Sequence, residues 1–183
     1  MTLAFFGCFR LGELCLPDHI PFDSEVHLCL GDISVEIVKK TLVVFLKRSK
    51  TDTTNAGVSV YVGCSGEKPC CAFCCMVTYL DFRRSLSVGQ APSAPLFVVP
   101  GGSPLCKGYL ISVMRILLSL SGFNPALYSG HSFRAGAATS AGDSEFRDWE
   151  LKMLGRWAST AYNVYLRNPR LTATFARRLV SRD

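Results

Sequence analysis

The sequence predicts a mainly helical α+β domain that contains a small three-stranded antiparallel sheet. Three short runs rich in β-branched residues follow one another at 34–38, 41–47 and 57–62. Much of the remaining chain places apolar residues at helical spacing. The length of 183 residues suits one domain, and 49% hydrophobic with 19% charged residues is enough for a core. Disordered, collagen-like and low-complexity classes are therefore excluded.

The first half of the chain is expected to form a helix, the sheet and a second helix. The first helix ends near Leu14, because prolines follow at positions 17 and 21. Lys39-Lys40 forms the turn between the first two strands. The segment Cys70–Leu86 then carries apolar residues at the spacing of one helix face, namely Phe73, Val77 and Leu80.

The second half is expected to be helical after a loop rich in proline, glycine and serine at 89–104. Ser103-Pro104 would begin the first of these helices as N-cap and first helical residue. Gly122 and Asn124-Pro125 would end it. Further helices are expected over 132–141, 149–155 and 159–166, and after Pro169.

Charge and cysteine content favour an intracellular protein with an anionic partner. The net charge is +6, and residues 131–183 carry nine basic against five acidic side chains. No apolar stretch reaches the roughly 18 residues of a membrane span, because Arg115 interrupts the best candidate. The apolar start lacks a basic region, and Arg10 ends it too early for a secretory signal. We therefore interpret the nine cysteines as reduced thiols.

Five segments place polar residues in otherwise apolar surroundings. They are 9–14 with Arg10 and Glu13, 47–52 with Lys50, 129–138 with His131 and Arg134, 155–157 with Trp157, and 162–167 with Tyr162 and Tyr165. Most have a structural explanation when taken singly: a surface ion pair, a solvated turn, or aromatic residues of the core. The third differs, because His131 and Arg134 share one face at a helix N-terminus, where free N–H groups and a guanidinium favour an anion.

In this order, the residues resemble the catalytic domain of the tyrosine recombinase, or phage integrase, family. The resemblance rests on Arg10 with Glu13, Lys50, His131-x-x-Arg134, Trp157 and a following tyrosine. The segments 49–52, 130–134 and 155–157 are most similar to recombinases of eukaryotic mobile elements. The resemblance covers Leu3 to about Arg178 and implies the integrase-type catalytic fold.

The resemblance also implies that the protein breaks and rejoins DNA. Arg10 and Arg134 would clamp the non-bridging oxygens of a scissile phosphate, which suits a planar and permanently charged group. Fixed cations there stabilise the negative charge that builds in the transition state. Glu13 would orient these cations.

The resemblance assigns the remaining chemistry to four residues. Tyr165 would be the nucleophile, giving a 3′-phosphotyrosyl bond and a free 5′-hydroxyl. Lys50 would protonate the departing 5′-oxygen, and His131 would help to manage the tyrosine proton and the phosphate charge. Trp157 stands where many family members have a second histidine, so its role would be positioning. No metal or nucleotide cofactor is implied, because the tyrosyl bond keeps the phosphodiester energy.

Two tyrosines compete for the role of nucleophile. The family's nucleophile follows the Trp157 position at a slightly longer spacing than either tyrosine has here. Tyr165 comes closer to that spacing, and Leu166-Arg167 follows it as in the family's tyrosine–aliphatic–arginine ending. We therefore favour Tyr165 and interpret Tyr162 as a packing residue.

The implied partner is double-stranded DNA. The family has a further N-terminal DNA-binding domain, and Arg10 lies so near the start that we expect residues 1–183 to be the catalytic domain alone, with weak and salt-sensitive DNA binding. The tail after Pro169 has apolar residues at helical spacing, and in the family such a helix docks on a neighbouring protomer of a homotetramer on DNA. Without DNA we expect a monomer, and in a eukaryote a nuclear location. The alternative is a catalytically inactive, domesticated DNA-binding or interaction protein of the same fold.

The cysteines between 64 and 75 have no counterpart in this resemblance. Cys71-x-x-Cys74, with Cys64 and Cys70, has the residue types of a four-thiolate zinc site. However, a second Cys-x-x-Cys pair is missing, and the start of a helix would divide these thiols, Cys75 included, between core and surface. The sequence therefore favours an assignment with no metal.

Overall fold

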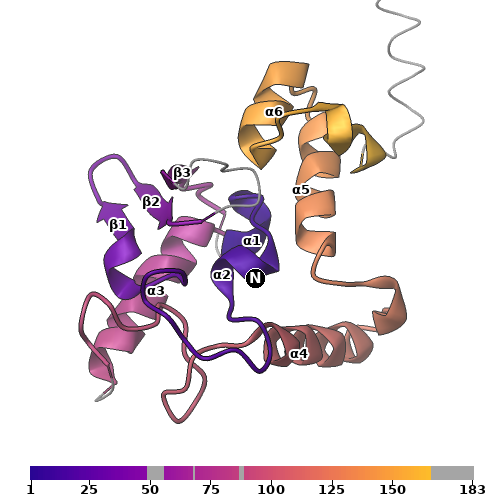
Figure 1. Ribbon diagram of the computed structural model, residues 1–183. Helices are drawn as coiled ribbons and strands as arrows, with labels where there is room; N and C mark the ends of the chain where they lie inside the picture. Colours follow the sequence, from indigo (N-terminus) through magenta and orange to yellow (C-terminus); the bar gives the residue numbers. More distant parts are fainter. Residues whose placement is uncertain (49–55, 68, 87–88, 166–183) are drawn as a thin grey trace, which may run out of the picture.

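The computed structural model in Figure 1 describes residues 1–48, 56–67, 69–86 and 89–165, and for Ala161, Tyr162 and Tyr165 it describes the backbone alone. Within these ranges the chain forms six α-helices, three 3₁₀ helices and one three-stranded antiparallel sheet. The predicted α+β, mainly helical fold class is confirmed. Lys50 and the predicted helix after Pro169 lie outside the described residues. In the part of the chain that is described, no helix is long and apolar enough to cross a membrane.

The sheet has β2 as its central strand. Side chains along β2 point alternately to the buried face and to the opposite face of the sheet. The strands are β1 (Ile33–Glu36), β2 (Thr41–Leu46) and β3 (Val58–Gly63). Val44 lies opposite Ile33 on one side and Val60 on the other. Leu42, Val44 and Leu46 are buried, whereas Phe45 points to the opposite face and is exposed. The strands begin and end within two residues of the predicted bounds.

The N-terminal segment forms two short helices where the sequence predicts one. These are α1 (Thr2–Phe6) and α2 (Leu11–Leu14), and Cys8 between them has a left-handed φ of 47°. The Glu13 carboxylate accepts a hydrogen bond from the backbone N–H of Arg10 at 2.9 Å. This contact caps α2 and starts it as a separate helix, so the prediction of one continuous helix is wrong. The break turns the chain just before Arg10.

The main core lies between the sheet, α1 and α3 (Ala72–Ser85). It contains Leu3 of α1, Leu42 and Val62 of the sheet, and Met76 of α3, all of them buried. The helix predicted over 70–86 is confirmed with a start at Ala72. The loop preceding β1 carries the short 3₁₀ helix η1 (Leu30–Asp32).

The second half is helical, as the sequence predicts. It comprises α4 (Lys107–Leu120), η2 (Pro125–Leu127), α5 (Ser132–Asp143), α6 (Asp148–Gly155) and η3 (Thr160–Tyr165). The predicted start of α4 at Pro104 is wrong, because the backbone of the residues around 105–107 forms hydrogen bonds with other segments of the chain. The Leu105 N–H donates to the Phe97 carbonyl at 2.9 Å, and the Lys107 N–H donates to the Leu16 carbonyl at 2.8 Å. Cys106 consequently becomes the N-cap.

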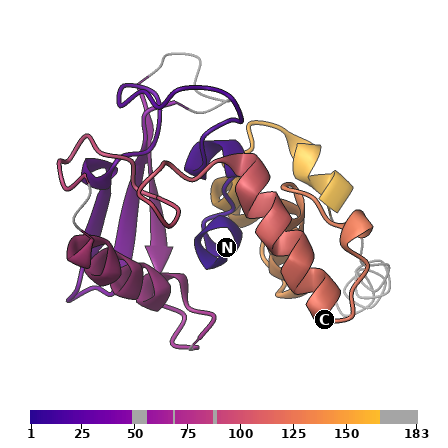
Figure 2. The same ribbon diagram turned by 90° about the horizontal axis from the view of Figure 1, so that it is seen from below.

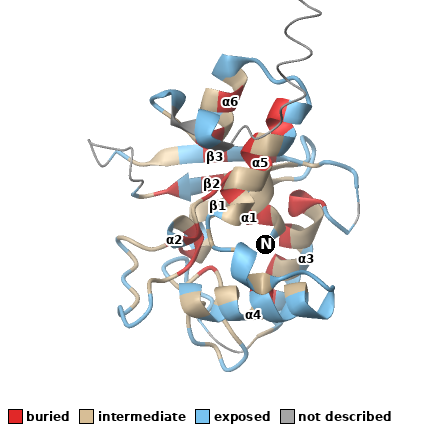
Figure 3. Ribbon diagram, turned by 90° about the vertical axis from the view of Figure 1, so that its right-hand side faces the viewer, coloured by how far each residue is buried: buried red, intermediate tan, exposed pale blue. Residues whose placement is uncertain are grey.

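The N-terminal helices lie between two groups of elements. Figures 1 and 2 show the sheet and α3 on one side of α1 and α2, and α4 to α6 on the other. α1 contacts both α3 and α5. Burial is concentrated on the elements around α1, whereas α4 is largely exposed (Figure 3). The turn between α1 and α2 therefore meets α5 and the end of α6, although these segments are far apart in the sequence.

Candidate functional site

Arg10 and Glu13 are joined at the first turn of α2. In addition to the backbone contact, the Arg10 Nη1 atom forms an ion pair with Glu13 Oε1 at 2.9 Å. The Glu13 side chain is only 6% exposed, and that of Arg10 is 24% exposed. The interpretation as a surface ion pair is therefore wrong, because the carboxylate lies inside the protein while the guanidinium reaches the surface.

A second arginine, Arg156, reaches the same carboxylate from the end of α6. Its Nη2 atom lies 2.9 Å from Glu13 Oε2, and its Nη1 atom donates to the Gly7 carbonyl at 3.0 Å. Arg156 adopts the left-handed conformation, with φ 53° and ψ 44°, as it ends α6. Arg156 was not predicted as a site residue, because its only sequence signal is its place between Gly155 and Trp157.

A third arginine, Arg134, lies on α5 and is buried, with 2% exposure. Its Nη1 atom donates to the Cys8 carbonyl at 2.6 Å, and its Nη2 atom donates to the Gly155 carbonyl. The guanidinium also lies over the Trp157 ring, with Cζ 4.5 Å from the ring centroid. Burial, and secondarily the charges of Arg10 and Arg156, lower the pKa of Arg134, but an arginine remains a cation under these conditions.

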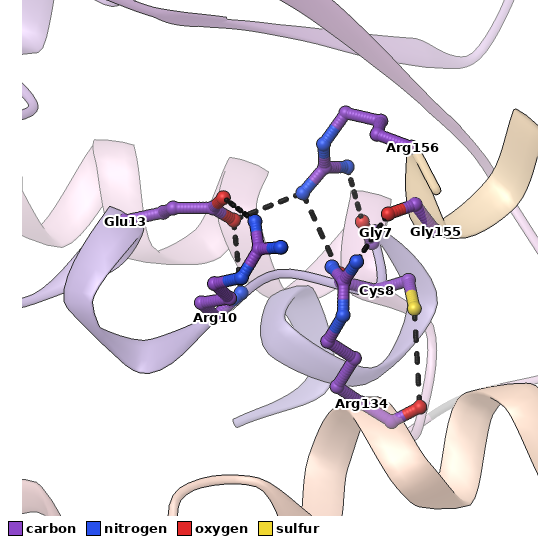
Figure 4. Close-up of polar contacts among 7 residues, drawn as sticks. All are labelled: Gly7, Cys8, Arg10, Glu13, Arg134, Gly155 and Arg156. Carbon is purple, nitrogen blue, oxygen red and sulfur yellow. Dashed lines mark hydrogen bonds and ion pairs between the residues drawn. The ribbon is translucent and has the colours of Figure 1, made fainter. Parts of the chain in front are cut away.

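Figure 4 shows the side chains of Arg10, Glu13, Arg134 and Arg156 around the turn between α1 and α2. Among the residues that the structure describes, three guanidinium groups gather there with one carboxylate, so positive charge is in excess. Uncompensated charge in a partly buried place is costly in free energy, and a bound anion reduces this cost. The arrangement can therefore hold a phosphate-like anion, with Arg10 as its most exposed cation.

Solved structures with similar folds were found, although at low sequence identity. They include XerA recombinase (TM-score 0.68, 17% identity, 100% of this chain and 56% of that chain). A XerH site-specific recombinase bound to difH substrate in a pre-cleavage complex matches with a TM-score of 0.61 and 17% identity, over 94% of this chain and 42% of the other. The Tn1549 transposon integrase in complex with transposon right end DNA matches with a TM-score of 0.62 and 13% identity, over 100% of this chain and 57% of the other.

The chain has the fold of a tyrosine recombinase catalytic domain. It spans about half the length of the solved structures that it matches. No protein-family model matches the sequence, and a comparison with curated proteins gives no match.

Within this recombinase fold, the structure brings together some of the predicted site residues and leaves others undescribed. Arg10, Glu13, Arg134 and Trp157 meet around the turn between α1 and α2. His131 is the exposed N-cap of α5, one turn before Arg134. Lys50 lies outside the described residues, so the prediction that it reaches this place stays a prediction.

The two candidate nucleophiles lie in η3, which packs against α5 and α6. Their backbone therefore belongs to the helical group that carries Arg134 and Arg156. The side chains of Tyr162 and Tyr165 lie outside the described part of the structure, so the choice between them stays a prediction.

The recombinase fold also gathers three of the four cysteines that the sequence offers for a zinc site, although the sequence favours an assignment with no metal. The thiol sulfurs of Cys64, Cys71 and Cys74 all lie within 4.8 Å of one another. Burial raises the pKa of the Cys71 thiol, but hydrogen bonds from the Cys74 backbone and from Ser65 outweigh it and lower the pKa to about 6. Cys70 and Cys75 are not members of this group.

Proposed function

We propose that residues 1–183 are the catalytic domain of an enzyme that breaks and rejoins DNA by site-specific recombination or integration. The observation that carries this proposal is the meeting of Arg10, Arg134 and Arg156 around Glu13 in a recombinase fold. Two of the similar solved structures are complexes with difH substrate and with transposon right end DNA. A double-stranded DNA partner, a mobile-element origin, a nuclear location and a homotetramer on DNA are parts of the same proposal.

In this proposal the arginines hold the scissile phosphate. Arg10 is exposed enough to meet a phosphate, while Glu13 fixes the direction of its guanidinium through Nη1. Arg156 balances the same carboxylate from the other side, which keeps Glu13 in place. Fixed cations of this kind stabilise the charge of a pentacoordinate transition state without reorganising during the reaction.

Arg134 adds its positive charge to the same group of arginines from a buried position. In the structure its guanidinium holds the turn at Cys8 and the end of α6 at Gly155, and it lies over Trp157. Trp157 therefore acts as a positioning residue for Arg134 in this proposal. Arg134 would meet a phosphate oxygen only by exchanging one of its carbonyl contacts for it.

The chemical step then uses Tyr165, Lys50 and His131. The Tyr165 oxygen attacks phosphorus, an oxygen–phosphorus bond forms, and the bond from phosphorus to the 5′-oxygen breaks. The proton of the tyrosine leaves with help from His131, and the ammonium of Lys50 supplies a proton to the 5′-oxygen. The phosphotyrosyl bond conserves the energy of the phosphodiester, so rejoining needs no added energy source.

One observation favours a second candidate, a catalytically inactive DNA-binding or interaction protein. Arg134 is 2% exposed, and both of its Nη atoms donate to backbone carbonyls. A guanidinium in such contacts stabilises the fold whether or not a phosphate ever binds.

Covalent trapping separates the two candidates. The chain is joined to the DNA-binding domain of a recombinase and incubated with nicked suicide duplexes that were first selected for binding from a randomised pool. The proposed enzyme gives a protein–DNA adduct that survives denaturing electrophoresis. Binding without any adduct would instead support the inactive protein.

A further inference from the structure

The thiols of Cys64, Cys71 and Cys74 form a compact group at the junction of sheet and helix. Cys64 directly follows β3, Cys71 is the N-cap of α3, and Cys74 lies in the first turn of that helix. The Cys71 and Cys64 sulfurs are 3.5 Å apart, and those of Cys64 and Cys74 are 4.0 Å apart. These three residues come together because β3 and α3 pack against each other.

These distances suit sulfur ligands around one metal ion. A zinc–sulfur distance of about 2.3 Å in a tetrahedron places its sulfurs roughly 3.8 Å apart. The separations here bracket that value, and all three sulfurs lie within 4.8 Å. A disulfide would need sulfurs about 2 Å apart, which is far shorter than either distance.

The surroundings of Cys71 also suit a thiolate ligand. Cys71 is the buried N-cap of α3, so its side chain lies at the end of the helix where the backbone N–H groups of the first turn favour a thiolate. Donors of this kind commonly orient the ligands of a metal from outside the coordination sphere. In the described residues the group contains sulfur ligands alone, a donor set that selects thiophilic ions over magnesium or calcium.

The neighbouring cysteines provide an internal comparison. Cys75 follows Cys74 on the same helix, but its Sγ donates to the Pro69 carbonyl at 3.2 Å and is not in the group. Cys106 is the N-cap of α4, another helix. The group is thus defined by geometry and not by the general abundance of cysteine in the chain.

We propose that Cys64, Cys71 and Cys74 form a three-thiolate site for a thiophilic metal ion such as zinc. The ion joins the end of β3 to the start of α3, and a water molecule completes its tetrahedron. Binding favours the folded chain, because the unfolded chain does not hold the three thiols together. The site is independent of the proposed recombinase function.

Metal titration tests the proposal on the whole chain. The reduced, chelator-treated protein is titrated with Co²⁺, which reports thiolate ligands through charge-transfer absorption, and then with Zn²⁺ in competition. We expect one ion per chain and a sulfur-to-cobalt band that zinc abolishes. Cys64→Ser and Cys74→Ser should each weaken binding by more than about tenfold, because each removes one ligand. Cys75→Ser and Cys106→Ser should bind as the wild type does.

Thermal unfolding keeps the test decisive if a variant folds poorly. Zinc should raise the melting temperature of the wild-type chain and of Cys75→Ser, and a chelator should reverse the rise. No cobalt band and no zinc-dependent shift in the wild type would overturn the proposal, as would equal losses of binding in Cys75→Ser and Cys74→Ser. Adduct formation with DNA has a different readout, so failure of one proposal is distinguishable from failure of the other.

Discussion

Arg156 and Glu13 are 143 positions apart in the sequence and form an ion pair of 2.9 Å. Their side chains are 12% and 6% exposed, so the pair lies largely inside the protein. Arg10 shares the same carboxylate. Glu13 therefore forms ion pairs with two cations, Arg10 and Arg156, from segments far apart in the sequence.

Neutralising Glu13 should destabilise the fold strongly. Glu13→Gln keeps the size of the side chain but leaves the guanidinium of Arg156 without its counter-charge in a buried place. We expect the free energy of unfolding to fall by about 3–5 kcal/mol in urea titrations. Glu36→Gln is the matched control, because Glu36 pairs with Lys39 at the surface and should change stability by less than about 1 kcal/mol. Equal losses of unfolding free energy in the two variants would show that the buried ion pairs of Glu13 stabilise the fold no more than an exposed pair does.

Replacing Arg134 by lysine should also be costly, although the charge is kept. Lysine cannot donate from a planar fork to the Cys8 and Gly155 carbonyls, nor cover the Trp157 ring in the same way. We expect Arg134→Lys to lose about 2–4 kcal/mol of stability, measured by urea unfolding. Arg84→Lys, at an exposed pair with Asp81, serves as control and should be almost neutral. A stable Arg134→Lys protein would contradict the structural role given to this guanidinium.

Stability should decline in alkaline solution because of Cys15. Burial raises the pKa of the Cys15 thiol from 9.0 to about 12. A folded-state pKa above the unfolded value contributes stability that is complete below pH 9 and is lost as pH rises towards 12. Between pH 8 and pH 10.5 the wild type should lose on the order of 2 kcal/mol more than Cys15→Ala does, as compared by urea unfolding. If the free energy of unfolding changed with pH in the same way in both proteins, Cys15 would not be the origin of the alkaline loss of stability.

DNA binding should depend on Arg10 in a salt-sensitive manner. Arg10 is the most exposed cation of the cluster, so a phosphate bound there releases a counterion. In anisotropy titrations of a labelled duplex at several salt concentrations, Arg10→Ala should weaken binding and reduce the salt slope by about one. Arg84→Ala removes an exposed charge of α3 and should leave the slope nearly unchanged. An unchanged slope in Arg10→Ala would place the bound phosphate elsewhere.

Local patterns in the sequence were enough to predict much of the fold. The alternation of side chains in 41–47 indicates which face of β2 is buried. This pattern can be recognised from residues that are close together in the sequence. The break between α1 and α2 was not predictable in this way, because it depends on the side chain of Glu13 turning back to the Arg10 N–H. The start of α4 was missed for a similar reason, since residues before it pair with Leu16 and Phe97, far away in the sequence.

The candidate site was likewise predictable only where local sequence was enough. Arg10, Glu13 and Arg134 were identified from the family order, but the contacts of Arg156 with Glu13 and Gly7 exist only after the end of α6 has met the turn between α1 and α2. Cys64, Cys71 and Cys74 were named in the sequence together with Cys70, but an assignment with no metal was favoured, because spacing rules compare cysteines along one segment. Cys64 joins Cys71 and Cys74 through the packing of a strand on a helix.

Mapping the covalent adduct tests most directly whether Tyr165 is the nucleophile of a recombinase active site. The chain joined to a DNA-binding domain is trapped on suicide DNA, digested, and the modified peptide is sequenced by mass spectrometry. We expect the nucleotide on Tyr165, with the adduct absent in Tyr165→Phe and retained in Tyr162→Phe, while both variants still bind DNA. A nucleotide on Tyr162, or tight binding with no adduct in the wild-type protein, would contradict this assignment.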